Sequence, residues 1–499
     1  MFYIRKVKTS SSSCSIQVVR YENRKTIIVK HIGSARTKED IFLLKNKARE
    51  YIQKITKQIG LFDVLNVKQT GKILQVDRLE YLGFRYSFVY KIINEVFRLF
   101  GFERLQNKTL LDLVLIRIIE PSSKLHSLEL LDEFFGIKYE ITDVYRKIKS
   151  FASFKDAVEK ATVEFAKKNL GFDFSIVFYD VTTLYFETFV EDDLRKCGFS
   201  KDNKFNQPQI IIGLIVESDG FPVAFEVFEG NKFEGHTLLP SIVNFKNRHK
   251  IGNLTVVADA AMISKESVKN LLKHNLNYIV GARLSNLEST LQKKIAKRLN
   301  RQDGKTTRIK TESGFLICDF SIKRYHKDKY EMEKQIKKAR ILLKNPSKIS
   351  KRNKFLKISE KSKIEINEEL IEKTKMLLGI KGYYTNLYKQ KNKTIIKHYH
   401  NLWRVEKSFR MAKSDLKARP IYHHKIEAVK THILICFMAL AVGKFMELKT
   451  KMSLARIIKL LKSITEARIL DKITNEEIIL QSKISDEIKN MLNAIGVSY

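Results

Sequence analysis

The sequence predicts an α/β protein built around a mixed sheet whose elements follow in the order β-β-β-α-β-α-β, with an inserted domain and a mainly helical N-terminal region. Residues 171–288 carry this order, because three β-rich runs are followed by alternating helical and strand-like segments. Helical periodicity dominates the chain before this stretch, and Lys-rich segments follow it. The length of 499 residues corresponds to roughly three or four folding units.

The N-terminal region is expected to contain two units. Residues 1–60 hold two predicted strands, SIQVVRY and KTIIVKHIG, and a charged helix that begins at about Lys38. Residues 61–170 show helical periodicity that is interrupted at Gly101, Pro121 and Gly136. Ser122 or Ser123 is expected to cap the helix that follows the proline.

Residues 171–288 are expected to form the first part of the sheet. The runs FSIVFYDVTTLYFE, IIIGLIVES and FPVAFEVFEG are rich in β-branched and aromatic residues, and Asp219-Gly220 is a hairpin signal between the second and third. HTLLPSIVNFKNRHK predicts a helix, LTVVADAAM a buried strand, SKESVKNLLKHN a Ser-capped helix and NYIVGARL another buried strand. A hairpin followed by alternating helices and strands indicates a mixed sheet covered by helices.

The remainder of the chain divides into three expected units. Residues 289–390 have the pattern of an insertion that mixes short strands, such as GFLICDFSIKRY, with Lys-rich helices. Residues 391–448 contain a predicted helix over about 397–417 and a very apolar helix over about 425–448. Residues 449–499 are expected to form short amphipathic helices.

The chain is strongly basic, with 93 Lys and Arg against 55 Asp and Glu and a net charge of +38. Such a field attracts polyanions, so DNA is an expected partner, although the codon usage of an AT-rich genome explains the Lys content equally well. Residues 291–370 alone hold 24 Lys and Arg against 10 Asp and Glu, and we expect the insertion to bind the DNA backbone. Residues 61–170 are a second candidate DNA-binding region, for which an ordinary helical bundle is the open alternative.

The composition also indicates a compartment. Four cysteines lie far apart without a CxxC pair, which fits a reducing cytoplasm and disfavours a zinc site or a disulfide framework. The basic start lacks the apolar run of a signal peptide. The most apolar stretch, 433–442, is far shorter than the ~20 residues that span a bilayer. We therefore expect a cytoplasmic protein with no membrane partner.

Asp180 and Asp259 stand within or at the end of apolar strands, in VFYDVTT and VVADAAM. A carboxylate inside a buried strand is costly unless something compensates it. In an RNase H-like sheet with this strand order, the first and fourth strands are central neighbours, so we expect the two aspartates to lie together. A divalent cation relieves the repulsion between two close carboxylates. A turn residue or a strand-end cap is the alternative for either aspartate taken alone.

Glu406 is the expected third acid. One face of its predicted helix is apolar, and an adjacent stripe holds Tyr399, Trp403, Glu406, Arg410, Lys413 and Lys417. This stripe would let Glu406 reach a metal while Arg410 and Lys413 face a phosphate backbone, whereas the alternative is a solvated helix with a Glu-to-Arg pair. Three carboxylates from two strands and a helix suit two-metal phosphoryl transfer, and oxygen ligands favour Mg²⁺ or Mn²⁺ over zinc.

Several segments resemble the DDE transposases of bacterial insertion sequences, in the group that carries the Y-R-E-K signature. They include RIIEPSSKLHSLELL, FYDVTTLYFE, EGNKFEGHTL, VVADAAMIS and YHNLWRVEKSFRMAKSDLKARPIYHH, of which the last is the most specific. The resemblance implies an RNase H-like domain with an acidic, metal-binding triad at Asp180, Asp259 and Glu406. It also implies that the signature tyrosine and lysine, at Tyr399 and Lys413, contact DNA.

The chain departs from this signature at one position. The signature arginine would stand where this chain has Leu402. Arg404 points to the opposite helix face, and Arg410 is better placed to replace it. This departure bears on the grip of the DNA end rather than on the metal site.

The resemblance implies a cut-and-paste transposase of a mobile element that binds terminal inverted repeats, cleaves DNA and joins 3′-hydroxyl ends to target DNA. A homodimer is expected in the synaptic complex, because two ends must be cut and joined, with part of its contact from the C-terminal helices. Trp403 is expected either to stack on an unpaired base at the transposon end or to pack beside the sheet. Another RNase H-like nuclease, or an inactive DNA-binding relic of a transposase, is the open alternative.

Overall fold

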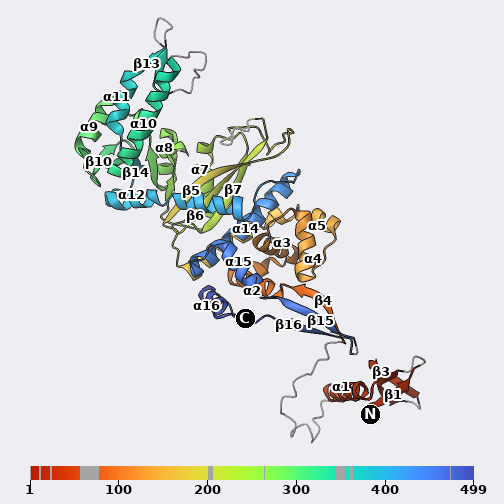
Figure 1. Ribbon diagram of the computed structural model, residues 1–499. Coiled ribbons are helices and arrows are strands. Elements are labelled where there is room, and N and C mark those ends of the chain that lie inside the picture. The colour runs from red at the N-terminus through yellow and green to blue at the C-terminus, as the bar shows by residue number, and fades with distance from the viewer. Residues whose placement is uncertain are drawn as a thin grey trace.

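The computed structural model describes residues 2–9, 13–22, 25–56, 78–199, 206–262, 264–343, 354–358, 364–472 and 474–498. Figure 1 shows an elongated arrangement, with the Lys-rich segment (the described part of residues 289–390) at one end, a large sheet and its helices in the middle and the N-terminal elements at the other end. The expected boundary between residues 60 and 61 lies outside the described residues.

The large sheet has eight strands in the order β10-β11-β14-β9-β8-β5-β6-β7. Its centre is the predicted β-β-β-α-β-α-β segment, which consists of β5 (Ile176–Tyr185), β6 (Gln209–Glu217), β7 (Pro222–Glu229), α7 (Leu238–Arg248), β8 (Thr255–Ala258), α8 (Lys265–Lys273) and β9 (Asn277–Ala282). β5 pairs antiparallel with β6 and parallel with β8, so the first and fourth strands are neighbours. The predicted α/β class is confirmed, and the sheet is consistent with an RNase H-like fold.

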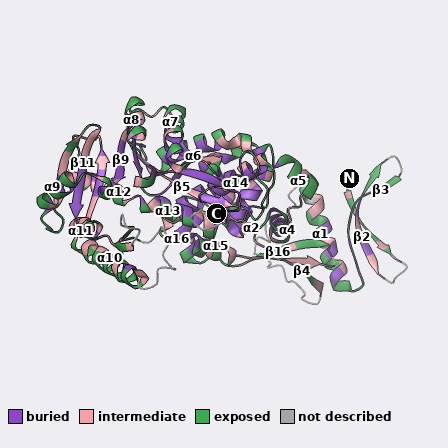
Figure 2. Ribbon diagram, turned by 90° about the horizontal axis from the view of Figure 1, so that it is seen from above, coloured by how far each residue is buried: buried purple, intermediate pink, exposed green. Residues whose placement is uncertain are grey.

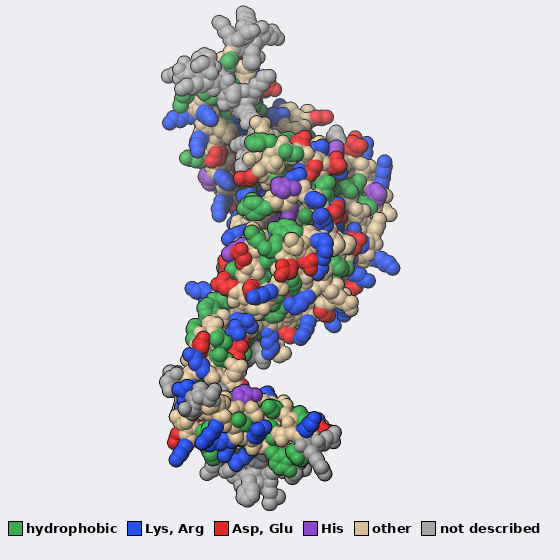
Figure 3. All heavy atoms as spheres, turned by 90° about the vertical axis from the view of Figure 1, so that its right-hand side faces the viewer, with side chains coloured by type: hydrophobic (Ala, Val, Ile, Leu, Met, Phe, Trp, Pro, Cys, Tyr) green, Lys and Arg blue, Asp and Glu red, His purple; other side chains and the backbone are tan. Residues whose placement is uncertain are grey.

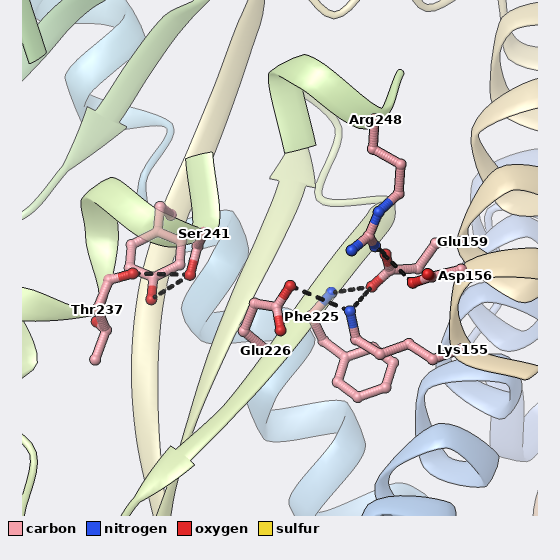
Figure 4. A network of polar contacts seen from close by, with 9 residues as sticks. Lys155, Asp156, Glu159, Phe225, Glu226, Thr237, Ser241 and Arg248 are labelled. Atoms are coloured by element: carbon pink, nitrogen blue, oxygen red, sulfur yellow. Dashed lines mark hydrogen bonds and ion pairs between the residues drawn. The ribbon is translucent and has the colours of Figure 1, made fainter. Parts of the chain in front are cut away.

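A buried polar network ties two helices to the edge of this sheet (Figure 4). Glu159, in α6 (Lys155–Leu170), accepts the backbone N–H of Phe225 in the edge strand β7 over 3.0 Å. Lys155 and Arg248, which come from α6 and α7, both pair with this carboxylate. Burial raises the pKa of Glu159, and the two cations oppose the rise. The network therefore satisfies a backbone donor on an edge strand and fixes α6 and α7 against it.

The core helix of the protein is α14 (Ile426–Thr450). It is the one helix among the described residues that is long and apolar enough to cross a membrane, yet 83% of its apolar window is buried inside the protein. It packs against α3 (Lys108–Ile119), β7 and α16 (Asp486–Ile495). Figure 2 shows buried residues concentrated where α14, α6 and β5 meet. Because α14 is surrounded by protein, its sequence is apolar on all sides.

The Lys-rich segment is not separate from the sheet. Its strands β10 (Thr306–Thr311), β11 (Gly314–Phe320) and β14 (Ile380–Thr385) extend the sheet beyond β9, and β14 pairs antiparallel with β9. Five further elements belong to this end: α9 (Ser289–Leu299), α10 (Ile322–Leu343), α11 (Glu368–Leu377) and the antiparallel pair of β12 (Leu356–Ile358) and β13 (Ile364–Ile366). The stretch that composition marks as an insertion thus supplies three strands of the large sheet.

The N-terminal elements largely follow their sequence patterns. A sheet of β1 (Phe2–Lys8), β2 (Cys14–Glu22) and β3 (Lys25–Ala35) packs on α1 (Lys38–Thr56) around a small apolar core. The helices α2 (Ser87–Phe100), α3, α4 (Lys124–Phe135), α5 (Ile141–Lys147) and α6 follow. Gly101 and Gly136 end α2 and α4 with positive φ angles, and the Ser123 side chain caps α4, as predicted.

The prediction that the last fifty residues form only helices is wrong. Between α15 (Leu454–Lys462) and α16, the strands β15 (Glu466–Asp471) and β16 (Glu476–Gln481) form a hairpin. β15 also pairs with β4 (Leu79–Arg85), which lies in the region expected to be helical. These strands depend on a partner from a distant part of the chain, which local periodicity does not detect.

Candidate active site

The two aspartates stand on neighbouring strands. Phe178 in β5 and Val257 in β8 are the last pair of facing residues between the two strands, and Asp180 and Asp259 each follow two positions later. Because side chains alternate along a strand, this register directs both carboxylates to the same face of the sheet. Asp180 is half-buried, and Asp259 is exposed just beyond the end of β8.

Glu406 comes from a helix that differs from the predicted one. The prediction of one continuous helix over 397–417 is wrong, because α12 (Asn392–His400) ends before α13 (Trp403–Arg410), which continues into a π-helical turn, Met411–Asp415. α12 packs on β8 and β9, and α13 packs on β5 and β6. The chain thus carries Glu406 across the face on which the aspartates stand.

The break between α12 and α13 removes Tyr399 from the predicted stripe. Tyr399 is only 5% exposed, and its hydroxyl donates a hydrogen bond to Asp259 Oδ1 over 2.9 Å. The expectation that this side chain contacts DNA directly does not fit its burial. Gly281 in β9 leaves room for the hydroxyl, because a Cβ there would lie 2.5 Å from the Tyr399 hydroxyl oxygen.

The Tyr399 hydroxyl lies in a negative environment. Burial raises the pKa of Tyr399, and the charge of Asp259 raises it further, so the hydroxyl keeps its proton and remains a donor. Asp180 and Glu406 act on this pKa in the same direction. Three acids from β5, the end of β8 and α13 are therefore within electrostatic reach of one hydroxyl group.

Lys381 is a cation among these acids. Its Nζ lies 4.8 Å from the centre of the Tyr399 ring. Burial and the nearby Arg324 lower the pKa of Lys381, while Asp259 and Glu406 are among the acids that oppose this fall. Because Lys381 stands on β14, the Lys-rich segment contributes a charged side chain to the candidate site.

The acids fit a hard divalent cation by their chemistry. Among the residues that the structure describes, no group of three or more His, Cys, Asp or Glu side chains is close enough to hold a metal ion. Asp180 Oδ1 accepts the Val181 N–H over 2.8 Å, and Asp259 Oδ1 accepts the Tyr399 hydroxyl. The set nevertheless offers only carboxylate oxygens, which are the ligands that Mg²⁺ and Mn²⁺ prefer.

The other predicted DNA contacts lie beyond the acids on the same segment. Trp403 is 53% exposed, so it does not pack beside the sheet, and Arg410 is exposed on α13. Lys413 is half-buried in the π-helical turn. Leu402, at the position of the signature arginine, is buried at 9% exposure, and Arg404 pairs with Asp219 in the β6–β7 turn. Arg404 is therefore engaged elsewhere, and the buried Leu402 cannot take the role expected of an arginine at this position.

Two residues of the site were missed in the sequence. The Tyr383 ring packs against the Tyr399 ring with the centroids 4.8 Å apart, and Lys381 stands two positions earlier on the same strand. Their only local signal is the alternation in KGYYT, which places positions 381, 383 and 385 on one face. The pairing of β14 with β9, which brings them to Tyr399, connects distant parts of the chain.

Positive charge is spread along the face of the molecule that Figure 3 shows. Figure 3 shows Lys and Arg side chains from one end of the visible face to the other, interspersed with acidic ones. The net charge of +38 therefore does not come from the Lys-rich segment alone. An extended polyanion would meet cations along its length.

A family model described as the transposase DDE domain matches residues 171–442. This range covers more than half of the chain and contains all three acids. No curated protein sequence matches the chain.

Several solved structures are weakly similar. A piggyBac transposase synaptic complex with hairpin DNA has a TM-score of 0.35 and 8% identity, over 87% of this chain and 74% of that chain. A Mos1 transposase paired-end complex with the left transposon end has a TM-score of 0.16 and 14% identity, over 47% of this chain and 66% of that chain. A Mos1 mariner paired-end complex with Mn has a TM-score of 0.15 and 14% identity, with the same coverage. These scores are too low to support an argument about this chain.

Proposed function

Since the chain belongs to the transposase DDE domain family, we propose that Asp180, Asp259 and Glu406 are the acids with which it cleaves DNA and joins the ends to a target. The observation that carries this proposal is the environment of the Tyr399 hydroxyl. This group donates a hydrogen bond to Asp259, and the charges of Asp180 and Glu406 raise its pKa. Like charges that are brought together repel each other, so a purely structural role offers no benefit that offsets this cost.

The proposed cofactor is Mg²⁺ or Mn²⁺, held by the three acids. When bound, such cations activate the attacking oxygen and stabilise the leaving oxygen. Tyr399 orients Asp259 through its hydrogen bond. Lys381 partly neutralises the negative charge that the acids present to one another. These two residues would keep the acids in place without contacting DNA.

The proposed substrate is the DNA at the terminal inverted repeats of an insertion sequence. Trp403 is placed to stack on an unpaired base, because its ring is exposed. Arg410 and Lys413 are the proposed phosphate contacts. Because two ends must be cut and joined, the proposed active assembly is a homodimer with one site for each end. Light scattering that finds only monomers in a complex with paired ends would contradict this assembly.

The experiment replaces each acid while keeping its shape. The variants are Asp180→Asn, Asp259→Asn and Glu406→Gln. Each is assayed on a plasmid that carries a marker between the two DNA segments that flank the gene of this protein. Excision and strand transfer should fall by orders of magnitude, whereas end binding should persist because Lys and Arg supply most DNA affinity. Glu427→Gln, at an exposed acid paired with Lys430, is the matched control.

Three outcomes decide the proposal. Products in which the ends are joined to target DNA distinguish a transposase from a nuclease that only hydrolyses. Wild-type strand transfer by any of the three variants would exclude that residue from the proposed triad. Loss of end binding in parallel with activity would instead indicate a structural role for the carboxylate.

A further inference from the structure

A second site lies away from the three acids, in a cavity of about 270 Å³. Most of its walls come from two distant segments, the α3–α4 junction at 117–125 and the loop at 417–423 that follows the π-helical turn, and Tyr145 and His432 complete them. The cavity is lined by Arg117, Lys124, Lys417 and Arg419, together with two histidines. Among the described residues, no Asp or Glu lines it.

Two of these cations are buried without a counter-charge. Arg117 is 3% exposed and Lys124 is 5% exposed. Within the part of the chain that the structure describes, Lys124 Nζ and Arg117 Nε have no hydrogen-bond partner. Arg117 Nη1 donates one long bond, 3.4 Å, to the Lys417 carbonyl oxygen. An uncompensated buried charge is expensive, and an anion bound between the two cations would offset this cost.

The protonation states of the neighbouring groups suit the cavity to an anion. Burial and, to a smaller extent, the charge of Arg117 together lower the pKa of Lys124 to about 7. Burial and the same two cations lower the pKa of His423 to about 4 and that of His432 as well, so both imidazoles are neutral at pH 7. His432 Nε2 lies 3.0 Å from the Ala418 carbonyl oxygen, which makes this nitrogen the N–H donor.

We propose that this cavity binds a phosphate group. Arg117 offers a planar fork of N–H donors for phosphate oxygens, and Lys124 offers a point charge beside it. Ser123 caps the twelve-residue helix α4, so the positive end of the helix dipole adds to the same field. The cavity is smaller than the ~300–1,000 Å³ of sites for whole small molecules, which favours an end group over a complete cofactor.

The phosphate has two potential sources, the 5′ end of a DNA strand and inorganic phosphate in solution. A phosphate within a duplex carries sugars on both sides, whereas a terminal phosphate can enter end-on and reach buried cations. Lys417 and the exposed Tyr422 at the rim follow the Glu406 helix in sequence, so we assign the site to a 5′-phosphate strand end. This source rests on the function proposed above, while phosphate binding itself does not.

Calorimetric titration of the full chain with inorganic phosphate tests the site. Lys124→Met should weaken binding about tenfold or more, the factor expected when a charge-assisted hydrogen bond is lost. Lys138→Met is the matched control, because Lys138 follows α4 with a side chain that is 82% exposed, and its Kd should equal that of the wild type. Lys417→Asn, which removes a rim cation where φ is +44, should weaken binding several-fold and leaves the buried groups unchanged.

Two otherwise identical duplexes, with a 5′-phosphate or a 5′-hydroxyl, separate the sources. Tighter binding of the phosphorylated duplex by the wild type, but not by Lys124→Met, supports the strand end. Equal binding of both duplexes, together with Lys124-dependent binding of inorganic phosphate, supports a phosphate site that is filled from solution. If neither probe depends on Lys124 or Lys417, the proposal is overturned. The phosphate titration needs no catalysis, so it stays informative if the proposed function fails.

Discussion

Replacing Lys124 with methionine should stabilise the protein at neutral pH. Lys124 is 5% exposed, and burial lowers its pKa from 10.5 to about 7. The unfolded chain therefore holds a proton that the folded chain binds only weakly at pH 7. At ~1.4 kcal/mol for each pH unit between the two values, this costs the folded state at most about 5 kcal/mol. Methionine has a similar length and no charge, so we expect a gain of roughly 2–4 kcal/mol.

The pH dependence follows from the proton counts of the two states. Between pH 7 and pH 10.5 the unfolded wild type binds more protons at Lys124 than the folded wild type, so its stability rises with pH. Lys124→Met lacks this titration. Its advantage should thus be largest below pH 7 and should vanish near pH 10.5. The other charged and titratable groups that act on Lys124 or line the cavity beside it are the same in both proteins. They include Arg117 on α3, His423, His432 and Cys436.

Urea denaturation followed by circular dichroism at pH 6.5, 8 and 9.5 measures the difference, with Lys138→Met as the control. The buffers must lack phosphate, because a ligand that binds the native state would stabilise the wild type selectively. A Lys124→Met protein that is less stable than the wild type at pH 6.5, or a difference that does not change with pH, would refute the reasoning. The expected result would mean that the wild type gives up stability to keep a cation in the cavity.

Two further predictions concern the acids and the sheet edge. Tyr399→Phe removes only the hydroxyl that holds Asp259, so it should lower strand transfer about tenfold and raise the Mg²⁺ concentration that gives half-maximal rate. Tyr388→Phe, at an exposed tyrosine, is the control. An unchanged Mg²⁺ dependence of Tyr399→Phe would exclude a positioning role for the hydroxyl. Glu159→Ala should lower the free energy of unfolding by roughly 3–5 kcal/mol, since it removes the buried carboxylate that Lys155 and Arg248 share and leaves the Phe225 N–H without its acceptor. Glu164→Ala, at an exposed residue of α6, should change stability by less than ~0.5 kcal/mol in the same urea titration, and equal effects of the two variants would contradict the network.

The sheet was predictable from sequence where its signals are local. β5, β6 and β7 follow runs of β-branched and aromatic residues, and the turn at Asp219-Gly220 joins β6 to β7, with Gly220 at φ +78. The adjacency of β5 and β8 followed from strand order alone. The strands β4, β14 and β15 were not predicted in these roles, because each pairs with a strand far away in sequence. Their stability comes from that partner rather than from their own pattern.

The candidate site shows the same division. Asp180 and Asp259 could be located because a charged residue inside an apolar strand is a local anomaly. The roles on the Glu406 segment could not be assigned from one helical period. A break at residues 401–402 separates buried Tyr399 from exposed Trp403, although both fall on the same stripe of an ideal helix.

The π-helical turn Met411–Asp415 has a larger consequence for function. It separates the helix that carries Glu406 from the loop at 417–423 that forms one wall of the phosphate cavity. A regular helix would have continued the stripe through Lys413 to Lys417, on a solvent-facing side. In the structure, Lys417 instead adopts a positive φ of +44, and its carbonyl oxygen accepts a bond from Arg117. The spacing between the proposed catalytic acid and the proposed phosphate site is therefore set by an irregular turn, a feature that is common at functional sites and has no period from which to predict it.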